Sequence, residues 1–224
     1  QERPDVIYAW DWAQCVDTLF VEHLLMRVPM VVTDMCNTLQ RLLPRSIPTT
    51  FGTPELCDRA RAKGHRQACP LLPPVDVHLN APGAVDPEPF RQRYGLGRSH
   101  LNIVTVSRLD SHMKGESLLR TIDAMRTLGR DAPVRFVIVG DGDARGDLER
   151  LAQHTNTELG REAIVFTGAL IDPRAAYAAA DIVVGMGSSV LRGMAFGKPV
   201  VIVGEAGFSA PLTPQTASSF LYNG

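Results

Sequence analysis

Residues 101–142, LNIVTVSRLDSHMKGESLLRTIDAMRTLGRDAPVRFVIVGDG, contain two apolar runs separated by a helix-like segment. Each run is nearly continuous, which is typical of strands in a parallel sheet that is covered on both faces. The stretch therefore predicts a strand, a helix over one face of the sheet, and a second parallel strand. The expected apolar stripe of that helix consists of Leu118, Leu119, Ile122, Met125 and Leu128.

The same alternation of strand-like and helix-like segments continues through residues 146–204. This rhythm predicts the α/β class, with a doubly wound parallel sheet in the C-terminal part of the chain. The first third alternates less cleanly, with strand-like runs at 4–10 and 29–35. We interpret it as part of a second, Rossmann-like α/β domain.

A proline-rich stretch, residues 69–90, separates the two alternating regions and has little periodicity. It predicts an ordered connection between domains. We expect an N-terminal domain over 1–75, a connection over 76–95 and a C-terminal domain over 96–224.

Composition excludes several classes of function. The chain has 224 residues, 45% apolar residues and a formal net charge of -1, so it lacks the basic field that drives nucleic-acid binding. Its apolar runs stop well short of the ~20 residues that a membrane span needs, which leaves only peripheral membrane association open. The four cysteines and six histidines show no metal-ligand spacing, and we expect packing cysteines in a reducing, cytoplasmic protein.

Ligands of open parallel sheets bind beyond the carboxyl ends of the strands, where the loop SRLDSHMKG (107–115) is expected. Arg108 leaves the end of one strand and Lys114 begins the next helix, so both cations can hold a phosphate or diphosphate beside free helix amides. The alternative is that Arg108 pairs with Asp110 while Lys114 is solvated.

The loop GMGSSVLRG (185–193) presents small residues just before another helix. Backbone amides and hydroxyls at such a turn form an anion site, or else the loop is simply a tight strand-to-helix turn. The residues concerned are Gly185, Gly187, Ser188 and Ser189.

The loop GDGDARG (140–146) is an imperfect glycine fingerprint for a dinucleotide. Asp141 and Asp143 would place negative charge where a pyrophosphate should lie, so we exclude a dinucleotide cofactor and expect no other. The pair also has the D-x-D spacing of a metal chelator, but a turn with acidic charge at the start of a helix is the favoured interpretation. We therefore expect no metal here.

Five segments in this order resemble the nucleotide-sugar domain of group 1 (family 4) retaining glycosyltransferases of the GT-B fold. They are VSRLDSHMKG, FVIVGDG, VFTGAL, AAYAAADIVV and GMAFGKPVV, and they cover residues 101–204. The resemblance implies an N-terminal acceptor domain and a C-terminal donor domain. It also implies a partial chain, with acceptor-domain segments expected before Gln1 and closing helices expected after Gly224.

The resemblance implies roles for individual residues. Arg108 and Lys114 match the family's catalytic pair, which holds the donor diphosphate, and the loop after the VFTG strand meets the nucleotide base. We assign Thr167, Ala169 and Leu170 to that loop.

This sequence departs from the family's pattern at the two glutamates that usually contact the sugar and the ribose. Val184 and Arg192 stand at the matching positions. A cation that can only donate hydrogen bonds therefore replaces one of the carboxylates, which only accept them. We expect Arg192 to lie at the interdomain cleft and to contact the donor, with Glu205 as a candidate replacement for the missing carboxylate.

The resulting hypothesis is a metal-independent, retaining glycosyltransferase that acts on a nucleotide-sugar donor and an unidentified acceptor. Two alternatives stay open: a degenerate or noncatalytic sugar-nucleotide-binding protein, and a sugar-nucleotide epimerase of the same architecture. The epimerase requires carboxylates and a histidine around the hexose, and the sequence shows no such cluster. Base, sugar, acceptor and oligomeric state are not defined by the sequence.

Overall fold

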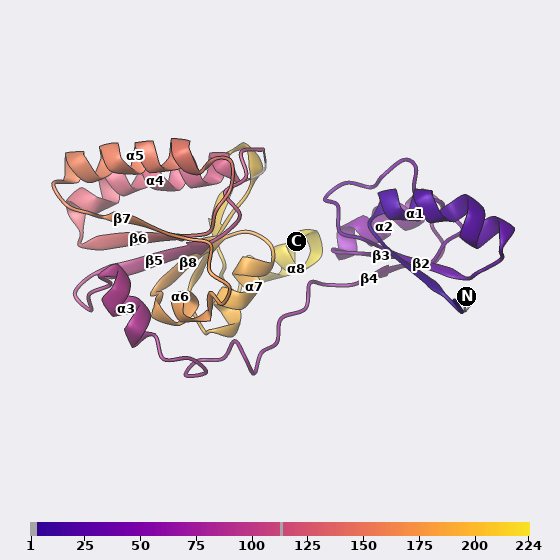
Figure 1. The fold of residues 1–224 in the computed structure, drawn as a ribbon, viewed down its shortest axis with the longest axis horizontal. Coiled ribbons are helices and arrows are strands. Elements are labelled where there is room, and N and C mark those ends of the chain that lie inside the picture. The colour runs from indigo at the N-terminus through magenta and orange to yellow at the C-terminus, as the bar shows by residue number, and fades with distance from the viewer. Residues whose placement is uncertain (1–3, 113) are drawn as a thin grey trace. The chain divides into compact units, whose positions relative to one another are not determined.

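The computed structural model describes residues 4–112 and 114–224, which form two compact units. The first unit comprises the chain up to Pro73 together with Thr213–Gly224, and the second comprises Pro74–Leu212. Each unit is an α/β structure built on its own sheet (Figure 1).

The first unit has a four-stranded sheet in the order β1-β2-β3-β4, and all neighbouring strands are parallel. Its core consists of apolar side chains such as Val32 and Phe51 from the strands and Leu56 and Ala60 from α2. Helix α2 begins at a proline, and the Thr53 hydroxyl oxygen caps it by accepting from Leu56 N at 3.2 Å. The elements are β1 Ile7–Trp10, α1 Trp12–Thr18, the π-helical η1 Leu19–Leu25, β2 Met30–Asp34, β3 Thr49–Phe51, α2 Pro54–Ala62, β4 Ala68–Pro70 and α8 Ala217–Asn223.

Helix α8 belongs to this first unit although it lies at the end of the chain. It contacts α2, and the Tyr222 hydroxyl donates to Asp58 Oδ2 at 3.0 Å. These residues fall within the stretch 96–224 that the sequence predicts as one domain, yet they fold with the N-terminal unit because this contact and hydrogen bond tie them to α2.

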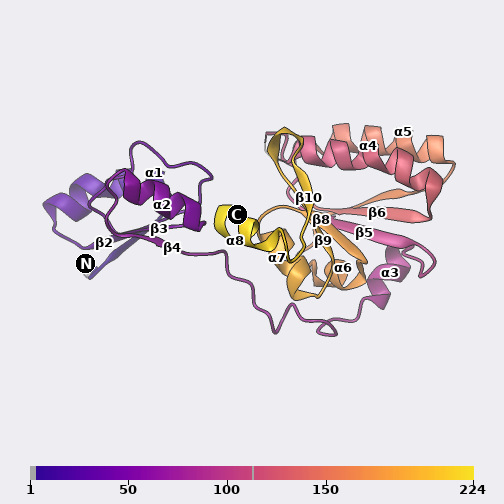
Figure 2. The same ribbon diagram turned by 180° about the vertical axis from the view of Figure 1, so that it is seen from behind.

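The second unit has a six-stranded sheet in the order β10-β9-β8-β5-β6-β7. The five strands β5 to β9 are parallel, and the short β10 is antiparallel at the edge beside β9 (Figure 2). The elements are α3 Glu88–Tyr94, β5 Leu101–Val106, α4 Gly115–Asp131, β6 Val134–Val139, α5 Arg145–Leu159, β7 Ile164–Gly168, α6 Arg174–Ala179, β8 Ile182–Gly185, α7 Ser188–Ala195, β9 Val200–Val203, the 3-10 helix η2 Glu205–Gly207 and β10 Ser209–Pro211.

Helices cover both faces of this sheet. Figure 1 shows α4 and α5 on one face and α3, α6 and α7 on the other. Each face has its own apolar core, one around Phe136 and Ile138 and the other around Val137 and Val139, because successive strand residues point to opposite faces. The predicted doubly wound arrangement is confirmed.

Helix α4 buries a narrower stripe than its sequence predicts. Leu118, Ile122 and Met125 are 4% exposed or less, but Leu119 and Leu128 are 39% and 46% exposed. The prediction for these two leucines was wrong. On a helix of 3.6 residues per turn, Leu119 is turned by about 100° and Leu128 by about 80° from the buried Leu118. None of the helices in the described residues combines the length and the hydropathy of a membrane-spanning segment.

Candidate functional site

The strand order of the second unit reverses at β5. From β5 the chain runs outward through β6 and β7 and then returns to place β8 on the other side of β5. The loops that leave β5 and β8 at their carboxyl ends therefore diverge, and such a switch point is where open α/β sheets bind ligands.

An open pocket of about 470 Å³ lies at this edge. Four strand-end loops and the first turns of α7 contribute to it, and α6 contributes the side chain of Tyr177. The described residues that line it are Val106, Ser107, Arg108, Lys114, Val139, Gly140, Asp141, Ala169, Leu170, Tyr177, Met186, Ser188, Ser189 and Arg192.

The loops after β5 and β6 are held together by backbone hydrogen bonds. Leu109 N donates to Asp141 O at 2.9 Å, and Ala144 N donates to Leu109 O at 2.9 Å. Gly140 has a φ of 144°, and a Cβ at this position would lie 1.7 Å from the carbonyl oxygen of Ser107. This close approach of two loops accounts for the glycines of GDGD without any dinucleotide.

Both aspartates of that loop have partners within the protein. Asp141 accepts from Gly142 N at 2.8 Å and pairs with Arg145 at 2.9 Å, and these contacts lower the pKa of its carboxyl group. Asp143 accepts from Ser111 N at 3.1 Å and Ser111 Oγ at 2.6 Å, which ties the loop before Lys114 in place. The negative charge of Asp141 at the pocket wall is thereby largely compensated.

Three cations line the pocket: Arg108, Lys114 and Arg192. Arg108 and Arg192 are exposed, whereas Lys114 is half-buried, and its burial and the nearby Arg108 charge lower the pKa of its ammonium group. Ser107 and Ser117 donate to the backbone carbonyls of Arg108 and Lys114, but among the described residues none of the three cationic side chains takes part in a salt bridge or hydrogen bond.

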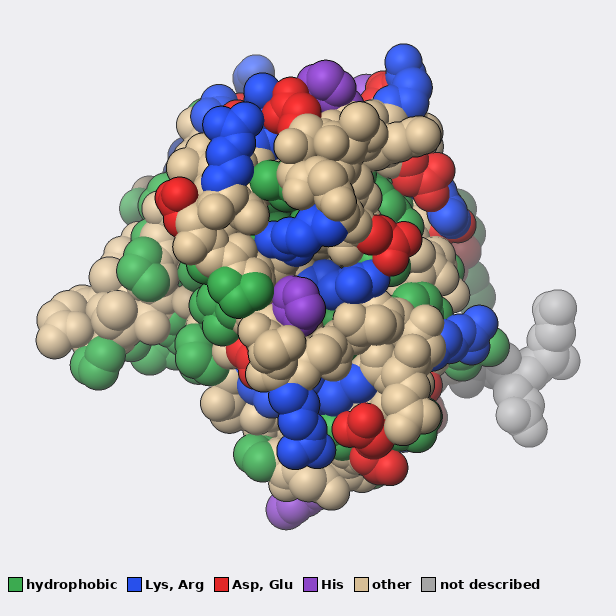
Figure 3. All heavy atoms as spheres, turned by 90° about the vertical axis from the view of Figure 1, so that its left-hand side faces the viewer, with side chains coloured by type: hydrophobic (Ala, Val, Ile, Leu, Met, Phe, Trp, Pro, Cys, Tyr) green, Lys and Arg blue, Asp and Glu red, His purple; other side chains and the backbone are tan. Residues whose placement is uncertain are grey.

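The sequence left open whether Arg108 pairs with Asp110. In the structure Asp110 Oδ1 accepts from the backbone N–H of His112 at 2.8 Å, and no described ion pair joins it to Arg108. Elsewhere arginines are paired, as in Arg135–Glu162 at 2.7 Å and Arg98–Glu88 at 3.8 Å. Figure 3 shows a face of the molecule on which positive and negative side chains are intermixed in this way. The described lining of the pocket contains three cations and a single carboxylate, that of Asp141.

Helix α7 brings Arg192 to the pocket because it packs tightly on β8. A Cβ at Gly193 would lie 3.0 Å from Val183 Cβ, so the glycine allows the close approach. Gly187, with a φ of 59°, forms the turn that starts the helix, and Ser189 Oγ donates to Met186 O at 3.1 Å.

The structure brings together most of the predicted site residues but not all. Arg108, Lys114, Ser188, Ser189, Arg192, Ala169 and Leu170 line the pocket. The remaining four, Gly185, Gly187, Thr167 and Glu205, are not among its lining residues. Thr167 instead donates its hydroxyl to Gly168 O at 2.8 Å, and Glu205 lies exposed in η2 beyond β9.

Val184 points into the core and does not reach the pocket. It is only 8% exposed and packs with the side chains under α4 and α5. The residue that matches the family's first glutamate is therefore an internal strand position, because β8 continues through Gly185. A carboxylate there would be buried among apolar groups.

Sequence reasoning missed Tyr177, whose ring is 1% exposed and stacks on Phe196 at 5.9 Å between centroids. It lines the pocket, and burial raises the pKa of its hydroxyl to about 12. Tyr177 is the only aromatic residue of α6, a helix otherwise rich in alanine, and that contrast is the signal that could have identified it.

Comparisons with known proteins identify a family for this region of the chain. Residues 100–221 match the family described as glycosyl transferases group 1. A comparison with curated protein sequences finds no match.

Several solved structures have similar folds. HepE from Anabaena in complex with UDP matches with a TM-score of 0.71 and 24% identity, covering 91% of this chain and 60% of its own. The UDP-forming α,α-trehalose-phosphate synthase from Burkholderia xenovorans matches with a TM-score of 0.68 and 15% identity, covering 91% and 59%. A glycosyltransferase from Rickettsia africae matches with a TM-score of 0.66 and 14% identity, covering 89% and 57%. The chain thus spans less than two thirds of the length of each.

These neighbours confirm the predicted GT-B fold class. The family match begins just before β5 and includes all the strands of the second unit and every loop that builds the pocket. It also covers more than half of the 224 residues. The resemblance first seen in five short segments thus extends through the whole sheet of the second unit, and the chain belongs to the group 1 glycosyltransferases.

Proposed function

We propose that the protein is a glycosyltransferase that binds a nucleotide-sugar donor in the pocket of the second unit and passes the sugar to an acceptor. The observation that carries this proposal is the set of three cations, Arg108, Lys114 and Arg192, lining one pocket without a described ion-pair partner. Such a group attracts a ligand with several negative charges, and a diphosphate fits that requirement.

The same cations supply the chemistry. When the bond between the sugar's anomeric carbon and the diphosphate oxygen breaks, negative charge grows on the departing diphosphate. Groups that are fixed around this charge stabilise the transition state more than the bound donor. We assign leaving-group stabilisation to Arg108 and Lys114 and a donor-phosphate contact to Arg192.

The proposed reaction needs no metal and retains the anomeric configuration. Metal independence is supported by the contacts of Asp141 and Asp143, the D-x-D pair of the loop after β6. Arg145 donates to Asp141 and Ser111 donates to Asp143, so both carboxylates already have partners within the protein. Retention rests on the family to which the chain belongs. The four free cysteines support a reducing, cytoplasmic location.

The apolar wall of the pocket suits the nucleoside part of the donor. Ala169 and Leu170 follow β7, and the ring of Tyr177 belongs to the same lining. HepE was crystallised with UDP and with UDP-glucose, which makes these two compounds the first probes for this chain.

A noncatalytic sugar-nucleotide-binding protein is the second candidate. Arg192 is the observation that favours it, because a guanidinium cannot accept hydrogen bonds from ribose hydroxyls as the family's carboxylate does. An epimerase is disfavoured, since none of the described residues that line the pocket is a histidine and only Asp141 is acidic.

Incubation of the purified chain with UDP-glucose separates these candidates. A transferase is expected to bind the donor and to release UDP slowly with water as acceptor, at the same rate with and without EDTA. Binding without any release of UDP supports the noncatalytic candidate. If neither UDP nor UDP-glucose binds, both candidate functions are contradicted for this donor. If EDTA abolishes the release of UDP and Mn²⁺ restores it, the proposed metal independence is contradicted.

A further inference from the structure

A second cluster of reactive side chains lies in the first unit, far along the sequence from the donor pocket. Asp11 follows β1, Asp34 ends β2, and Cys36 comes two residues later. The two strands are parallel neighbours, so these residues meet at the carboxyl edge of the first sheet. One oxygen of each carboxylate and the Cys36 Sγ all lie within 4.8 Å of one another.

Asp34 is completely buried, and half of its carboxylate has no partner. Its Oδ1 accepts from the backbone N–H of Cys36 at 3.1 Å, but its Oδ2 accepts no hydrogen bond from any described residue. A buried carboxylate oxygen without a partner is costly, and buried charges in proteins are normally paired or bound to a metal.

Asp11 also has a buried carboxylate oxygen without a hydrogen-bond partner among the described residues. It occupies the N-cap position of α1, yet its side chain makes no capping hydrogen bond, and its buried Oδ1 is unpartnered in the described structure. Its backbone has a φ of 91° and a ψ of 151°, a conformation that is strained for any residue except glycine. Neither helix capping nor backbone preference explains an aspartate here.

Within residues 4–112 and 114–224, no basic side chain forms an ion pair with either carboxylate, that of Asp11 or that of Asp34.

We propose that Asp11, Asp34 and Cys36 bind a divalent transition-metal ion of the zinc type, with a fourth position open to water or another ligand. Zn²⁺ binds carboxylate oxygens at about 2.0–2.2 Å and thiolate sulfur at about 2.3 Å, so only small side-chain rotations bring these atoms onto one ion. Binding displaces the thiol proton into solution and leaves a Cys36 thiolate on the metal.

The donor set decides the class of metal. A thiolate favours Zn²⁺ and similar ions, whereas Mg²⁺ and Ca²⁺ prefer all-oxygen ligands in larger number. Three protein ligands with one free position are also typical of zinc sites that interact with substrate. The spacing of cysteines and histidines along the sequence does not reveal this site, because its ligands come from the ends of two different strands.

Titration of the purified 224-residue chain with Co²⁺ tests the site without any need for transferase activity. We expect one equivalent of Co²⁺ to produce tetrahedral visible bands and a thiolate-to-cobalt charge-transfer band in the near ultraviolet, and Zn²⁺ to remove both. Cys36→Ser should lose the charge-transfer band, and Asp34→Asn should weaken Co²⁺ binding at least tenfold.

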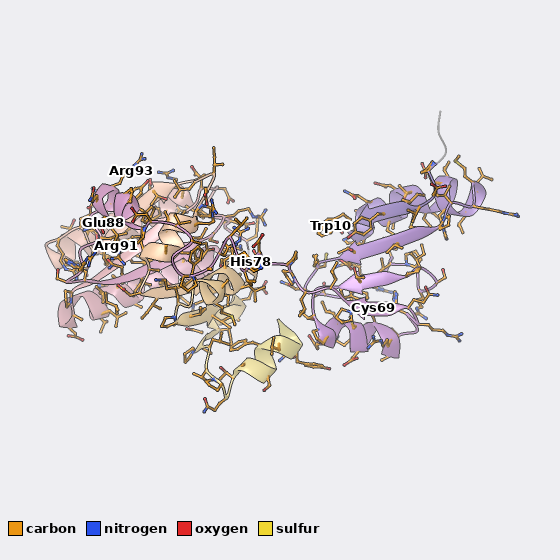
Figure 4. All side chains as sticks on the ribbon, turned by 90° about the horizontal axis from the view of Figure 1, so that it is seen from below. Trp10, Cys69, His78, Glu88, Arg91 and Arg93 are labelled. Atoms are coloured by element: carbon orange, nitrogen blue, oxygen red, sulfur yellow. The ribbon has the colours of Figure 1, made fainter. Side chains whose placement is uncertain are left out.

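Two control variants match these changes elsewhere in the first unit. Cys69→Ser removes an exposed thiol from β4, the edge strand opposite to the β1 strand that ends at Trp10 (Figure 4). Asp17→Asn removes an exposed carboxylate from α1. Both should bind Co²⁺ as the unaltered chain does.

Asp11→Gly distinguishes loss of a ligand from loss of the fold. Glycine relieves the positive φ at this position, so the variant should melt at the same or a higher temperature while binding Co²⁺ at least tenfold more weakly. A chain without the charge-transfer band, a band that survives in Cys36→Ser, or a band that disappears in Cys69→Ser would overturn the proposal. UDP binding tests the donor pocket separately, so failure of the metal site leaves the proposed function unaffected.

Discussion

Arg108 and Lys114 are the residues on which the proposed chemistry depends most. Both line the pocket without a described ion-pair partner, so a bound diphosphate would gain charge-assisted hydrogen bonds from each. We expect Arg108→Ala or Lys114→Ala to weaken UDP binding by about 1.5–3 kcal/mol, or roughly 10- to 150-fold. Arg130→Ala is the matched control, since Arg130 is an exposed cation at the far end of α4. Equal affinity in all three variants would contradict the assignment.

The lowered pKa of Lys114 gives the donor pocket a specific pH dependence. A bound anion favours the charged ammonium, so binding raises the Lys114 pKa above its value in the free protein. Affinity for UDP should therefore be highest at pH values below the lowered pKa of Lys114. It should decline as the pH rises through that pKa toward the ordinary lysine value of about 10.4.

Lys114→Arg provides the comparison, because a guanidinium stays charged over this range. Any titration of the ligand itself affects both proteins equally and cancels in the ratio of their affinities. A ratio that does not change with pH would show that Lys114 does not contact the anion.

Arg192 tests whether the departure from the family's pattern is an adaptation. With two other cations in the same pocket, it is best suited to a phosphate, so Arg192→Glu should weaken UDP-glucose binding by about tenfold to a hundredfold. Arg192→Gln separates loss of the positive charge from its inversion. Tighter binding in Arg192→Glu, measured by isothermal titration, would instead favour a degenerate site in which a lost carboxylate has been restored.

For single residues, the sequence predicts which side chains could bind the ligand better than it predicts where those side chains point. Arg108 and Lys114 could be predicted because a strand end and a helix start necessarily meet at one sheet edge. Val184 and Glu205 could not be placed in this way. Where β8 ends decides which way Val184 points, and Glu205 lies beyond β9, a strand farther from the switch point.

Among the elements, the close contact between the loops after β5 and β6 sets the shape of the pocket. Gly140→Ala would force a Cβ against the Ser107 carbonyl at a φ of 144°, and we expect it to cost about 2–4 kcal/mol of stability. Gly146→Ala is the control, since its Cβ meets no atom within 4 Å and it lies in the first turn of α5. That variant should be as stable as the parent or slightly more stable. Thermal unfolding measures both, and a Gly140→Ala chain that melts like the Gly146→Ala chain would contradict this role.

The elements themselves were predictable to the extent that periodicity determines them. The near-continuous apolar strands 101–106 and 134–139 required cover on both faces, and the structure supplies it. Helix α8 shows the limit of such reasoning. Its residues carry no local signal that they pack on α2, because that contact joins segments at opposite ends of the chain.

For the complete chain, we expect UDP binding to stabilise the folded protein, because the ligand binds the folded state and not the unfolded one. Ligand at 100 times its dissociation constant adds about 2.7 kcal/mol to the free energy of unfolding of the unit that binds it. Because the chain has two compact units, the rise should appear in the unfolding of residues 74–212 and not in that of the first unit. A thermal scan with UDP that shifts only the transition of the first unit would place the nucleotide site elsewhere.

The proposed function rests on recognition of a diphosphate by the pocket of the second unit. Isothermal titration of the unaltered chain with UDP and with uridine, at the same salt concentration, measures this recognition. We expect one UDP to bind per chain, and uridine to bind at least 100-fold more weakly because it offers no charge to Arg108, Lys114 and Arg192. Equal affinities for UDP and uridine, or no measurable binding of UDP, would contradict it.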